Sequence, residues 1–324
     1  MSILKGKSIL VTGGTGSFGR RLVRRVLGEH DPARLVILSR DEFKQYQFAE
    51  ELGDDPRVRF FIGDVRDAGR LWRAFDGIEV VVHAAALKQV PAAEYNPFEA
   101  IKTNIHGAQN VIDAALDRKV ERVIALSTDK ASSPINLYGA TKLVSDKLFI
   151  AANAYAGANP TRFAVVRYGN VVGSRGSVVP FFQRLAPTGL LPITDDRMTR
   201  FWITLDQGVD FVIAMLGEMH GGELFVPKIP SMNIVDLAKA VAPDARLDVI
   251  GIRPGEKIHE QMISVDEARR TIDAGAFYII QPDADWWDGS AWAHANPVPD
   301  GFSYTSDNNG RLLTVDQLRV MIDA

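Results

Sequence analysis

The sequence contains no cysteine among its 324 residues. This absence excludes disulfide frameworks, thiolate zinc sites, iron–sulfur clusters and cysteine nucleophiles. No apolar run approaches the ~18 residues that would span a membrane, since the run Val80–Leu87 is interrupted by His83. No signal peptide is expected either, because the short apolar stretch Ser8–Thr12 leads directly into a glycine loop. We therefore expect a cytoplasmic protein with no membrane partner.

The sequence also lacks an excess of either charge. Lys and Arg total 37 and Asp and Glu total 40, which leaves a net charge of −3. That balance argues against a general nucleic-acid binder. The six histidines show no ligand spacing and no accompanying acidic cluster, so we expect no metal site. The chain is 46% hydrophobic, and its length suits two compact units.

Short β-branched runs alternate with helical patterns in the first half of the chain. Apolar strands separated by crossover helices indicate a parallel sheet that is covered on both faces. We predict an α/β fold in which residues 1–170 form a Rossmann-type doubly wound parallel sheet. Residues 171–324 mostly form a smaller substrate-binding domain and a tail, although elements around 205–226 are expected to rejoin the sheet. One helix is expected over Phe98–Arg118. The predicted strands are Ser8–Val11, Leu35–Leu38, Val58–Ile62, Val80–His83, Val123–Leu126 and Phe163–Arg167.

The strongest local signal is the glycine loop Val11–Gly19, which follows the first predicted strand and opens a helix. Its glycines allow a tight turn, close approach of a pyrophosphate and close packing of the helix on the strand. The anion would lie on free N–H groups at the positive end of the helix dipole. The loop therefore predicts dinucleotide binding by Gly13, Thr15, Gly16, Ser17, Phe18 and Gly19.

The end of the second strand distinguishes NAD from NADP. An acidic residue there would accept from the 2′-hydroxyl of NAD, whereas Ser39, Arg40 and Lys44 suit the 2′-phosphate of NADP. The adjacent Asp41 keeps NAD open, and a solvated surface helix is the alternative role for Arg40 and Lys44. Further cofactor candidates are Asp64 and Val65 (or a simple helix cap at Asp64), Ala84, Ala85 and Lys88.

Polar residues close the fifth predicted strand and continue onto the next helix. Thr128, Asp129 and Lys130 end the strand, and Tyr138 and Lys142 follow at a spacing that places them on one helical face. A lysine ammonium close to a phenol is expected to lower the pKa of the phenol. Tyr138 would then take a proton from a substrate hydroxyl while a hydride leaves for the nicotinamide.

The chain resembles the extended short-chain dehydrogenase/reductase superfamily. The residues that carry this resemblance are Thr12–Gly19, Asn104, Thr128, Tyr138 and Lys142. Five further strings resemble the configuration-inverting UDP-N-acetylglucosamine 4,6-dehydratases that begin pseudaminic acid synthesis, and the likeness runs to about residue 265. Related retaining dehydratases usually carry Asp-Glu where this chain has Asp129-Lys130, and this departure indicates inversion at carbon 5. Tyr138 argues against a second inverting group, which has methionine there. The five strings are Ser39–Gln45, His83–Pro91, Ser127–Ala131, Met198–Phe201 and Arg253–Lys257.

We expect a cycle with no net redox change. Tyr138 deprotonates the carbon 4 hydroxyl and NADP+ accepts the hydride. Lys130 removes the carbon 5 proton while Asp129 protonates the departing hydroxyl. NADPH then returns the hydride to carbon 6, and a proton reaches carbon 5 from the opposite face. The alternatives are a sugar-nucleotide 4-epimerase or reductase, which needs only Tyr138 and Lys142, and a non-catalytic NADP-sensing protein.

The second domain should supply cations for the diphosphate of UDP-N-acetylglucosamine, because a guanidinium can bind phosphate oxygens bidentately. A surface ion pair is the alternative for Arg253 and Glu256, and Lys88 suits either ligand. The resemblance implies a homo-oligomer, by family a hexamer, and the tail tryptophans Trp286, Trp287 and Trp292 are expected in a surface flap or an interface. The substrate-binding candidates are Lys88, Asn170, Thr194, Arg200, Arg253 and Glu256.

Overall fold

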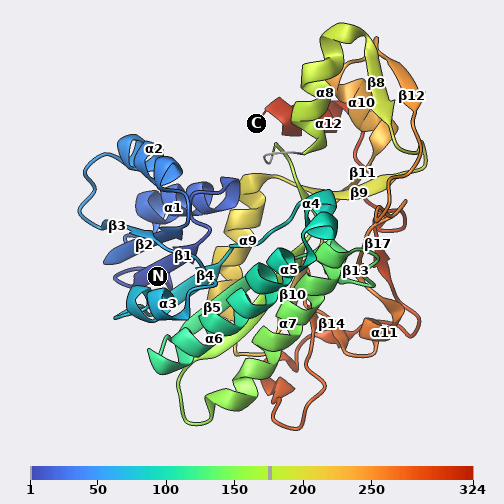
Figure 1. The fold of residues 1–324 in the computed structure, drawn as a ribbon. Coiled ribbons are helices and arrows are strands. Elements are labelled where there is room, and N and C mark those ends of the chain that lie inside the picture. Colours follow the sequence, from blue (N-terminus) through green and yellow to red (C-terminus); the bar gives the residue numbers. More distant parts are fainter. Residues whose placement is uncertain (1, 174–176, 324) are drawn as a thin grey trace.

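The computed structural model, which describes residues 2–173 and 177–323, is built around a ten-stranded sheet (Figure 1). Neighbouring strands run parallel from β3 across to β10, and the remaining three are antiparallel. The predicted α/β, Rossmann-type fold is thereby confirmed. In spatial order the strands are β3 (Val58–Ile62), β2 (Arg34–Ser39), β1 (Ser8–Thr12), β4 (Val80–His83), β5 (Arg122–Thr128), β6 (Arg162–Tyr168), β10 (Leu224–Pro227), β15 (Phe277–Ile280), β14 (Thr271–Asp273) and β16 (Asn296–Pro297).

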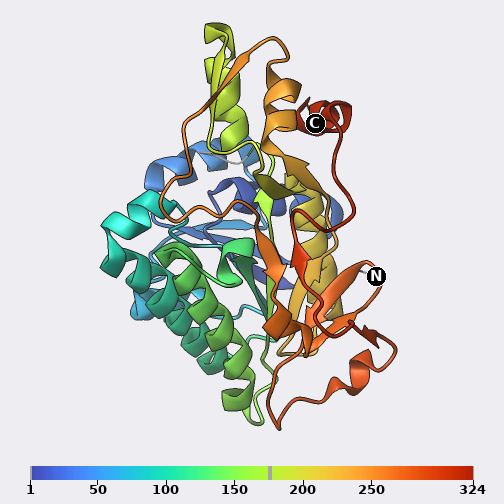
Figure 2. The same ribbon diagram turned by 90° about the vertical axis from the view of Figure 1, so that its right-hand side faces the viewer.

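Helices cover both faces of the sheet (Figures 1 and 2). On one face α1 packs on α9, and on the other α3, α6 and α7 pack together. Strands with helices on both sides are nearly all apolar because neither face is solvated, and β4 is buried at every residue. These helices and their neighbours are α1 (Ser17–Glu29), α2 (Glu42–Leu52), α3 (Ala68–Ala74), α4 (Val90–Tyr95), α5 (Pro97–Ile101), α6 (Gly107–Asp117), α7 (Leu137–Ala156) and α9 (Leu205–Glu218).

The helix expected over Phe98–Arg118 is interrupted by a π-helical turn at Lys102–His106, where the N–H of Gly107 bonds to the carbonyl of Lys102. The turn contains Asn104, whose side chain bonds to both backbone groups of Leu87 and to the Thr141 hydroxyl. Extra residues in a helical turn often occur at functional sites. Here the turn holds the loop that follows β4 against α7.

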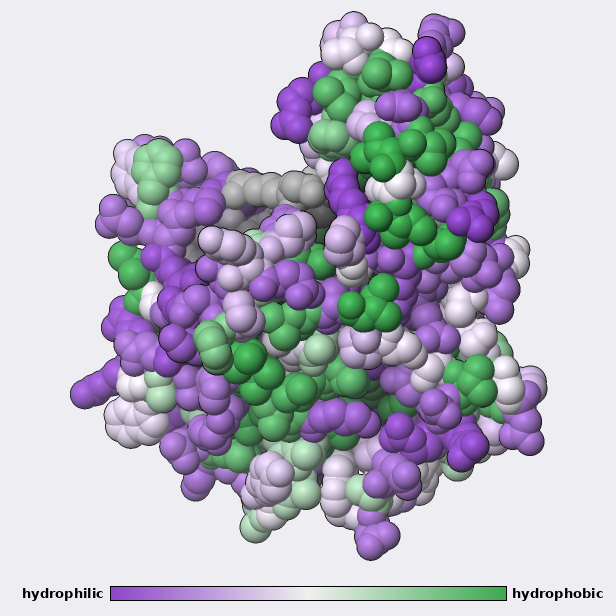
Figure 3. All heavy atoms as spheres, turned by 45° about the vertical axis from the view of Figure 1, so that its right-hand side comes forward, coloured by the Kyte–Doolittle hydropathy of each residue, from purple (hydrophilic) through white to green (hydrophobic). Residues whose placement is uncertain are grey.

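A smaller unit projects from the sheet and has its own hydrophobic cluster, which includes Phe182, Leu191, Trp202 and Leu237. It forms the upper right part of Figure 1, and the same lobe stands above the main body in Figure 3. Its elements and the segments that join it to the sheet are β7 (Asn170–Val171), α8 (Val178–Leu185), β8 (Leu190–Ile193), β9 (Thr199–Ile203), β11 (Ser231–Asn233), α10 (Ile234–Val241), β12 (Arg246–Val249), β13 (Gln261–Ile263), α11 (Val265–Ala268), β17 (Tyr304–Thr305) and α12 (Val315–Asp323).

The sheet extends further along the chain than the sequence indicated. Strand β10 belongs to the sheet and helix α9 packs against it, both in the region expected to rejoin it, and β15, β14 and β16 then continue the sheet. These last three strands lie within residues 171–324, which the sequence predicts to form mostly the second unit and a tail. An antiparallel pair such as β14–β15 needs only a short turn, so no crossover helix announces it in the sequence.

Trp292 is not part of a surface flap or an interface of this chain. Its side chain is 4% exposed, and its ring lies 6.0 Å from Phe225 and 6.1 Å from Phe277 between ring centroids. The indole N–H donates to Glu223 at 3.2 Å. Trp286 is 38% exposed. Within the described residues no helix is long and apolar enough to cross a membrane.

Candidate active site

A pocket of about 600 Å³ lies where the carboxyl ends of β1, β2, β4 and β5 meet the start of α7. Figure 3 shows the surface hollowed between the lobe and the main body. Parallel strands bring their carboxyl ends to one edge of the sheet, which is where such folds bind ligands. The pocket is lined by Gly13, Thr15, Gly16, Ser17, Phe18, Gly19, Ser39, Arg40, Lys44, Asp64, Val65, Ala84, Ala85, Lys88, Thr128, Asp129, Lys130, Tyr138, Lys142 and Asn170, all of them predicted site residues.

The glycine loop forms one end of the pocket. Gly13 has φ +65°, and a Cβ there would lie 2.9 Å from the amide nitrogen of Ala85. A Cβ on Gly19 would lie 2.5 Å from the Cα of Gly14, so α1 approaches the loop after β1 too closely for a side chain at Gly19. Helix α1 begins after Gly16 without a side-chain cap, which leaves its first N–H groups available to an anion. This cradle fits the pyrophosphate of a dinucleotide.

The neighbouring strand end is held by Thr12 and His83. The Thr12 hydroxyl accepts from the N–H groups of Ala84 and Ala85 at 3.1 and 3.2 Å and bonds to His83 Nδ1 at 2.8 Å. His83 is 1% exposed, and burial, with a smaller contribution from Lys142, lowers its pKa to about 3. His83 therefore faces the core of the sheet.

The end of β2 presents cations to the pocket. Arg40 and Lys44 line it with about half of each side chain exposed (51% and 43%). Asp41 caps α2 by accepting from the Lys44 amide at 3.0 Å and pairs with the Lys44 ammonium at 2.5 Å. Its carboxylate is therefore already engaged within the helix start. Asp64 is not the cap of α3, because Asp67 holds that position and Asp64 pairs with Arg66 at 2.7 Å.

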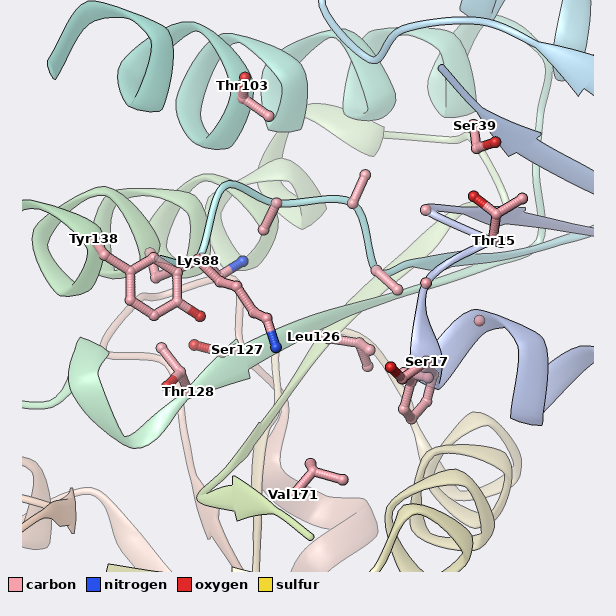
Figure 4. A pocket seen from close by; sticks show the side chains of 18 of the residues that line it. Thr15, Ser17, Ser39, Lys88, Thr103, Leu126, Ser127, Thr128, Tyr138 and Val171 are labelled. Atoms are coloured by element: carbon pink, nitrogen blue, oxygen red, sulfur yellow. The ribbon is translucent and has the colours of Figure 1, made fainter. Parts of the chain in front are cut away.

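At the other end of the pocket Tyr138 projects from the start of α7, close to Thr128 and Lys88, whereas Thr15, Ser17 and Ser39 lie at the glycine-loop end (Figure 4). Burial raises the pKa of Tyr138 to about 12, although the positive charge of Lys130 acts to lower this pKa. The pKa of Tyr138 is therefore raised rather than lowered, and Lys130 is the lysine whose charge opposes the rise. Lys142 is itself buried, which lowers its own pKa, and the charge that counters this is Asp146, one helical turn further on.

Asp129 and Lys130 belong to a buried charge cluster with Glu260. The Lys130 ammonium lies 3.0 Å from Asp129 Oδ1 and 3.1 Å from Glu260 Oε1. Asp129 is 1% exposed and Glu260 2%. Burial lowers the pKa of Lys130, but the two carboxylates outweigh it and raise that pKa. For Asp129, burial raises the pKa and outweighs the Lys130 charge. Lys130 and Asp129 are therefore in direct contact, close enough for a proton to pass between them.

The substrate-binding candidates separate into two groups. Lys88 and Asn170 line the pocket, and the Asn170 Oδ1 atom is buried without a partner in the described residues. Burial lowers the pKa of Lys88. Arg253 is 55% exposed and lies 3.8 Å from Glu256, the surface pair that was the alternative for these residues. The Thr194 hydroxyl bonds to the sulfur of Met198 at 3.1 Å. Thr194, Arg200, Arg253 and Glu256 are absent from the described lining of this pocket.

The guanidinium of Arg200 is occupied by backbone carbonyls, unlike that of an arginine whose donors are free to bind a phosphate. Its guanidinium donates to the carbonyls of Thr199, Ile258 and Lys257 at 2.7, 3.0 and 2.9 Å, and Nε lies 3.8 Å from Glu260. With these donors engaged, Arg200 positions the segment that carries Glu260. Its assignment as a substrate residue remains a prediction from the sequence.

Sequence reasoning missed Glu260 as a site residue. It lies three positions after the string Arg253–Lys257, in a segment with no strand or helix periodicity. Its proximity to Lys130 depends on a contact across 130 residues of chain, and no local pattern marks such a contact. The missed pocket residues include Thr103, Leu126, Ser127, Tyr168, Val171 and Trp202.

The chain was compared with known proteins. Residues 9–282 match the family described as polysaccharide biosynthesis protein. The chain is 56% identical to a UDP-N-acetylglucosamine 4,6-dehydratase (inverting) of Campylobacter jejuni subsp. jejuni serotype O:2, covering 94% of this chain and 93% of the relative. It is 43% identical to a UDP-glucose 4-epimerase of Rickettsia conorii, covering 86% and 83%.

Two solved structures show the same architecture. Pen from Bacillus thuringiensis has a TM-score of 0.91 at 35% identity, covering 99% of this chain and 98% of that one. The dTDP-glucose 4,6-dehydratase DesIV of Streptomyces venezuelae, solved as a double mutant with NAD and DAU bound, has a TM-score of 0.67 at 25% identity over 77% and 86%. The fold is therefore that of the extended short-chain dehydrogenase/reductases. More narrowly, the chain belongs to the polysaccharide biosynthesis protein family.

Among the residues that the structure describes, no cluster of three histidine or acidic side chains is arranged to hold a metal ion.

Proposed function

We propose that this protein converts UDP-N-acetylglucosamine into the 4-keto, 6-deoxy sugar nucleotide with inversion at carbon 5. The observation that carries the proposal is the contact between the buried Asp129 and the partly buried Lys130, in the pocket that also holds Tyr138. Hydride exchange at one carbon needs a single acid–base group, whereas elimination of water also needs a base for a carbon-bound proton and an acid for the leaving hydroxyl. The name of the 56% identical relative supports the same reaction.

The described residues suit a nicotinamide dinucleotide, which when bound would supply a reversible hydride acceptor. The glycine loop and the start of α1 would hold its pyrophosphate. Tyr138 takes the proton of the carbon 4 hydroxyl, and Thr128 and Lys130 both favour its phenolate form. Lys142, buried on the same helix, adds positive charge at this end of the pocket.

Elimination begins with a proton shift inside the Asp129–Lys130 contact. Transfer of one proton across the 3.0 Å contact turns an ammonium and a carboxylate into an amine and a carboxylic acid. The Lys130 amine then accepts the carbon 5 proton, and the electrons of that C–H bond form the carbon 5–carbon 6 double bond. The carbon 6–oxygen bond breaks, and the hydroxide leaves as water with the Asp129 proton. The pair ends as the ion pair from which it started, so its proton count is unchanged.

The reaction is tested by analysing the product made in heavy water. In ordinary water we expect a product about 18 Da lighter than the substrate through loss of one water. In heavy water the product should carry deuterium at carbon 5 in the inverted configuration by NMR. A substrate isomer of unchanged mass would instead assign the chain to the 4-epimerases, the activity named for its 43% identical relative. Retained configuration at carbon 5 would contradict the inverting assignment.

The Lys130→Ala variant tests the assignment of the base. Proton transfer by a positioned group contributes about 10² to 10⁴ in rate, so dehydration should fall by that factor. Lys147→Ala, on the solvent-exposed face of α7, is the matched control and should retain the wild-type rate. Near-normal dehydration by Lys130→Ala would show that another group removes the carbon 5 proton.

We also propose NADP rather than NAD as the preferred cofactor. Asp41 also lines the pocket, but its carboxylate is paired with Lys44, so Arg40 is the cation beside the 2′ position that Asp41 does not engage. Arg40→Ala should lower the ratio of NADP+ to NAD+ affinity about 10-fold, because a hydrogen bond to a charged group is worth about 1.5–3 kcal/mol. Fluorescence titration with both dinucleotides measures the ratio, and an unchanged ratio would exclude Arg40 from cofactor selection.

The wider setting follows from the family resemblance. We propose a cytoplasmic homo-oligomer, in the resembled family a hexamer, that performs the first step of pseudaminic acid synthesis for flagellin or surface glycans. Light scattering of the purified protein tests the assembly. Deletion of the gene, with analysis of the cell's sugar nucleotides, tests the pathway.

A further inference from the structure

Glu260 contacts Lys130 of the Asp129–Lys130 pair from outside the pocket. Its carboxylate lies 3.1 Å from the Lys130 ammonium, is 2% exposed and is absent from the described lining of the pocket. Its second oxygen, Oε2, is buried and has no partner among the described residues, as is also the case for Asp129 Oδ2. One ammonium is thus shared by two buried carboxylates, and only Asp129 also reaches the pocket.

The position of Glu260 is set by backbone contacts from several elements. Its N–H donates to the Ser306 hydroxyl at 2.9 Å, and its carbonyl accepts from the Ser306 N–H at 2.8 Å. The Ser306 hydroxyl bonds in turn to Thr199 at 2.7 Å. Arg200 donates to the carbonyls of Lys257 and Ile258, just before Glu260. The carboxylate of Glu260 is therefore held in place by the second unit rather than by the turn after β5 that carries Lys130.

The groups that face this cluster come from four elements. Asp129 and Lys130 follow β5, Tyr138 lies on α7, Arg200 on β9, and Lys257 on the segment before β13. The Lys257 ammonium donates to the carbonyl of Ser132 at 2.8 Å. The neighbouring His259 bonds to Thr199 through Nδ1. Burial raises the pKa of Glu260, but Lys130 and then Arg200 outweigh it, so the group remains ionised.

We propose that Glu260 is a positioning residue. Its fixed negative charge stabilises the protonated form of the Asp129–Lys130 pair, in which the two side chains share one proton. This inference rests on the proposed function, in which that proton becomes the acid for the leaving hydroxyl. A nearby negative charge stabilises the protonated form of a neighbouring pair. The charge of Glu260 does not change during elimination, because the proton moves only between Lys130, Asp129 and the substrate.

Neutralising Glu260 should make the Asp129–Lys130 pair lose its proton more easily, for two reasons. The attraction that holds the proton on the pair is lost, and the Arg200 guanidinium is left as an uncompensated positive charge nearby. Both lower the pH at which the pair loses its proton. A charge within about 4–6 Å shifts a pKa by about 1–3 units, so the alkaline limb of the activity should move down by that amount.

The test compares Glu260→Gln with wild type in pH profiles of kcat for dehydration. We expect the alkaline limb to move to lower pH by about 1–3 units, with KM little changed because Glu260 lies outside the pocket. Glu260→Asp keeps the charge and should recover most of the shift. The control is Glu223→Gln, a buried glutamate that accepts from His220, Gly221 and Trp292. It should lower the melting temperature without moving the limb.

A second readout separates this inference from the proposed function. The Lys130 ammonium is followed by NMR of lysine-labelled protein, assigned with Lys130→Arg, and its titration should move to lower pH in Glu260→Gln. This shift in a protein that performs no dehydration would refute the proposed function and leave the charge relationship intact. An unmoved titration and an unmoved alkaline limb in folded Glu260→Gln would overturn the inference. Should Glu260→Gln fail to fold, an alkaline limb of Glu260→Asp shifted as far as 1–3 units would overturn it too, since its charge is retained.

Discussion

Replacing Gly139 with alanine should disable the catalytic pair while leaving the fold in place. Gly139 is the third residue of α7, and a Cβ built there would lie 2.1 Å from the Lys130 carbonyl oxygen and 2.9 Å from its carbonyl carbon. Both atoms are backbone, so no side-chain rotation relieves the contact. Ordinary contact begins near 3.4 Å, and the Lys130 backbone must therefore move by roughly 1 Å relative to Tyr138. A misplacement of that size can cost about 10²-fold in rate.

The effect of this substitution on stability should be smaller than its effect on activity. Overpacking typically costs about 1–3 kcal/mol, whereas alanine in place of glycine within a helix gains about 1 kcal/mol. The free energy of unfolding should therefore fall by no more than about 2 kcal/mol. Dinucleotide affinity should persist, since the glycine loop lies at the opposite end of the pocket (Figure 4).

The assay measures steady-state dehydration, urea unfolding and dinucleotide binding for Gly139→Ala. Gly208→Ala is the matched control, because this glycine also lies within a helix, α9, and a Cβ there meets no other atom within 4 Å. That control should be as active as wild type and at least as stable. A Gly139→Ala protein with more than about half of wild-type activity would refute the reasoning, since about 10²-fold is expected.

Two further predictions concern buried charge. Arg167 is 1% exposed and lies 2.9 Å from Glu267 and 3.5 Å from Asp146, so Arg167→Met should destabilise the protein by about 3–5 kcal/mol through the uncompensated carboxylates; a loss below about 1 kcal/mol in urea unfolding would contradict this. His83 has its pKa lowered from 6.5 to about 3, chiefly by burial. Because the unfolded chain binds a proton that the folded chain refuses, stability should fall with decreasing pH between these values, by up to about 1.4 kcal/mol per pH unit. His83→Gln should flatten that slope, and an unchanged slope would exclude His83 as its source.

The cofactor half of the site could be predicted from the sequence because its motifs are short and local. The glycine loop, the Ser39-Arg40 step and the Thr128–Lys130 turn each follow a buried strand directly. Parallel strands bring their carboxyl ends to one edge of the sheet, so residues at successive strand ends must meet there. The same argument places Tyr138 beside Lys130, since its helix is the next crossover.

The tertiary structure alone decided the environment of those groups. Glu260 reaches Lys130 across 130 positions of chain, and Arg200 binds carbonyls instead of lining the pocket. Trp292 is buried against Phe225 of β10 and Phe277 of β15, and no helical pattern in the sequence indicates these strands. Residue types and short spacings predict the local backbone structure. Burial and charge pairing instead depend on side chains from distant segments of the chain. The sequence by itself therefore determined which chemical groups meet at the edge of the sheet, and long-range packing decided which of them hold protons.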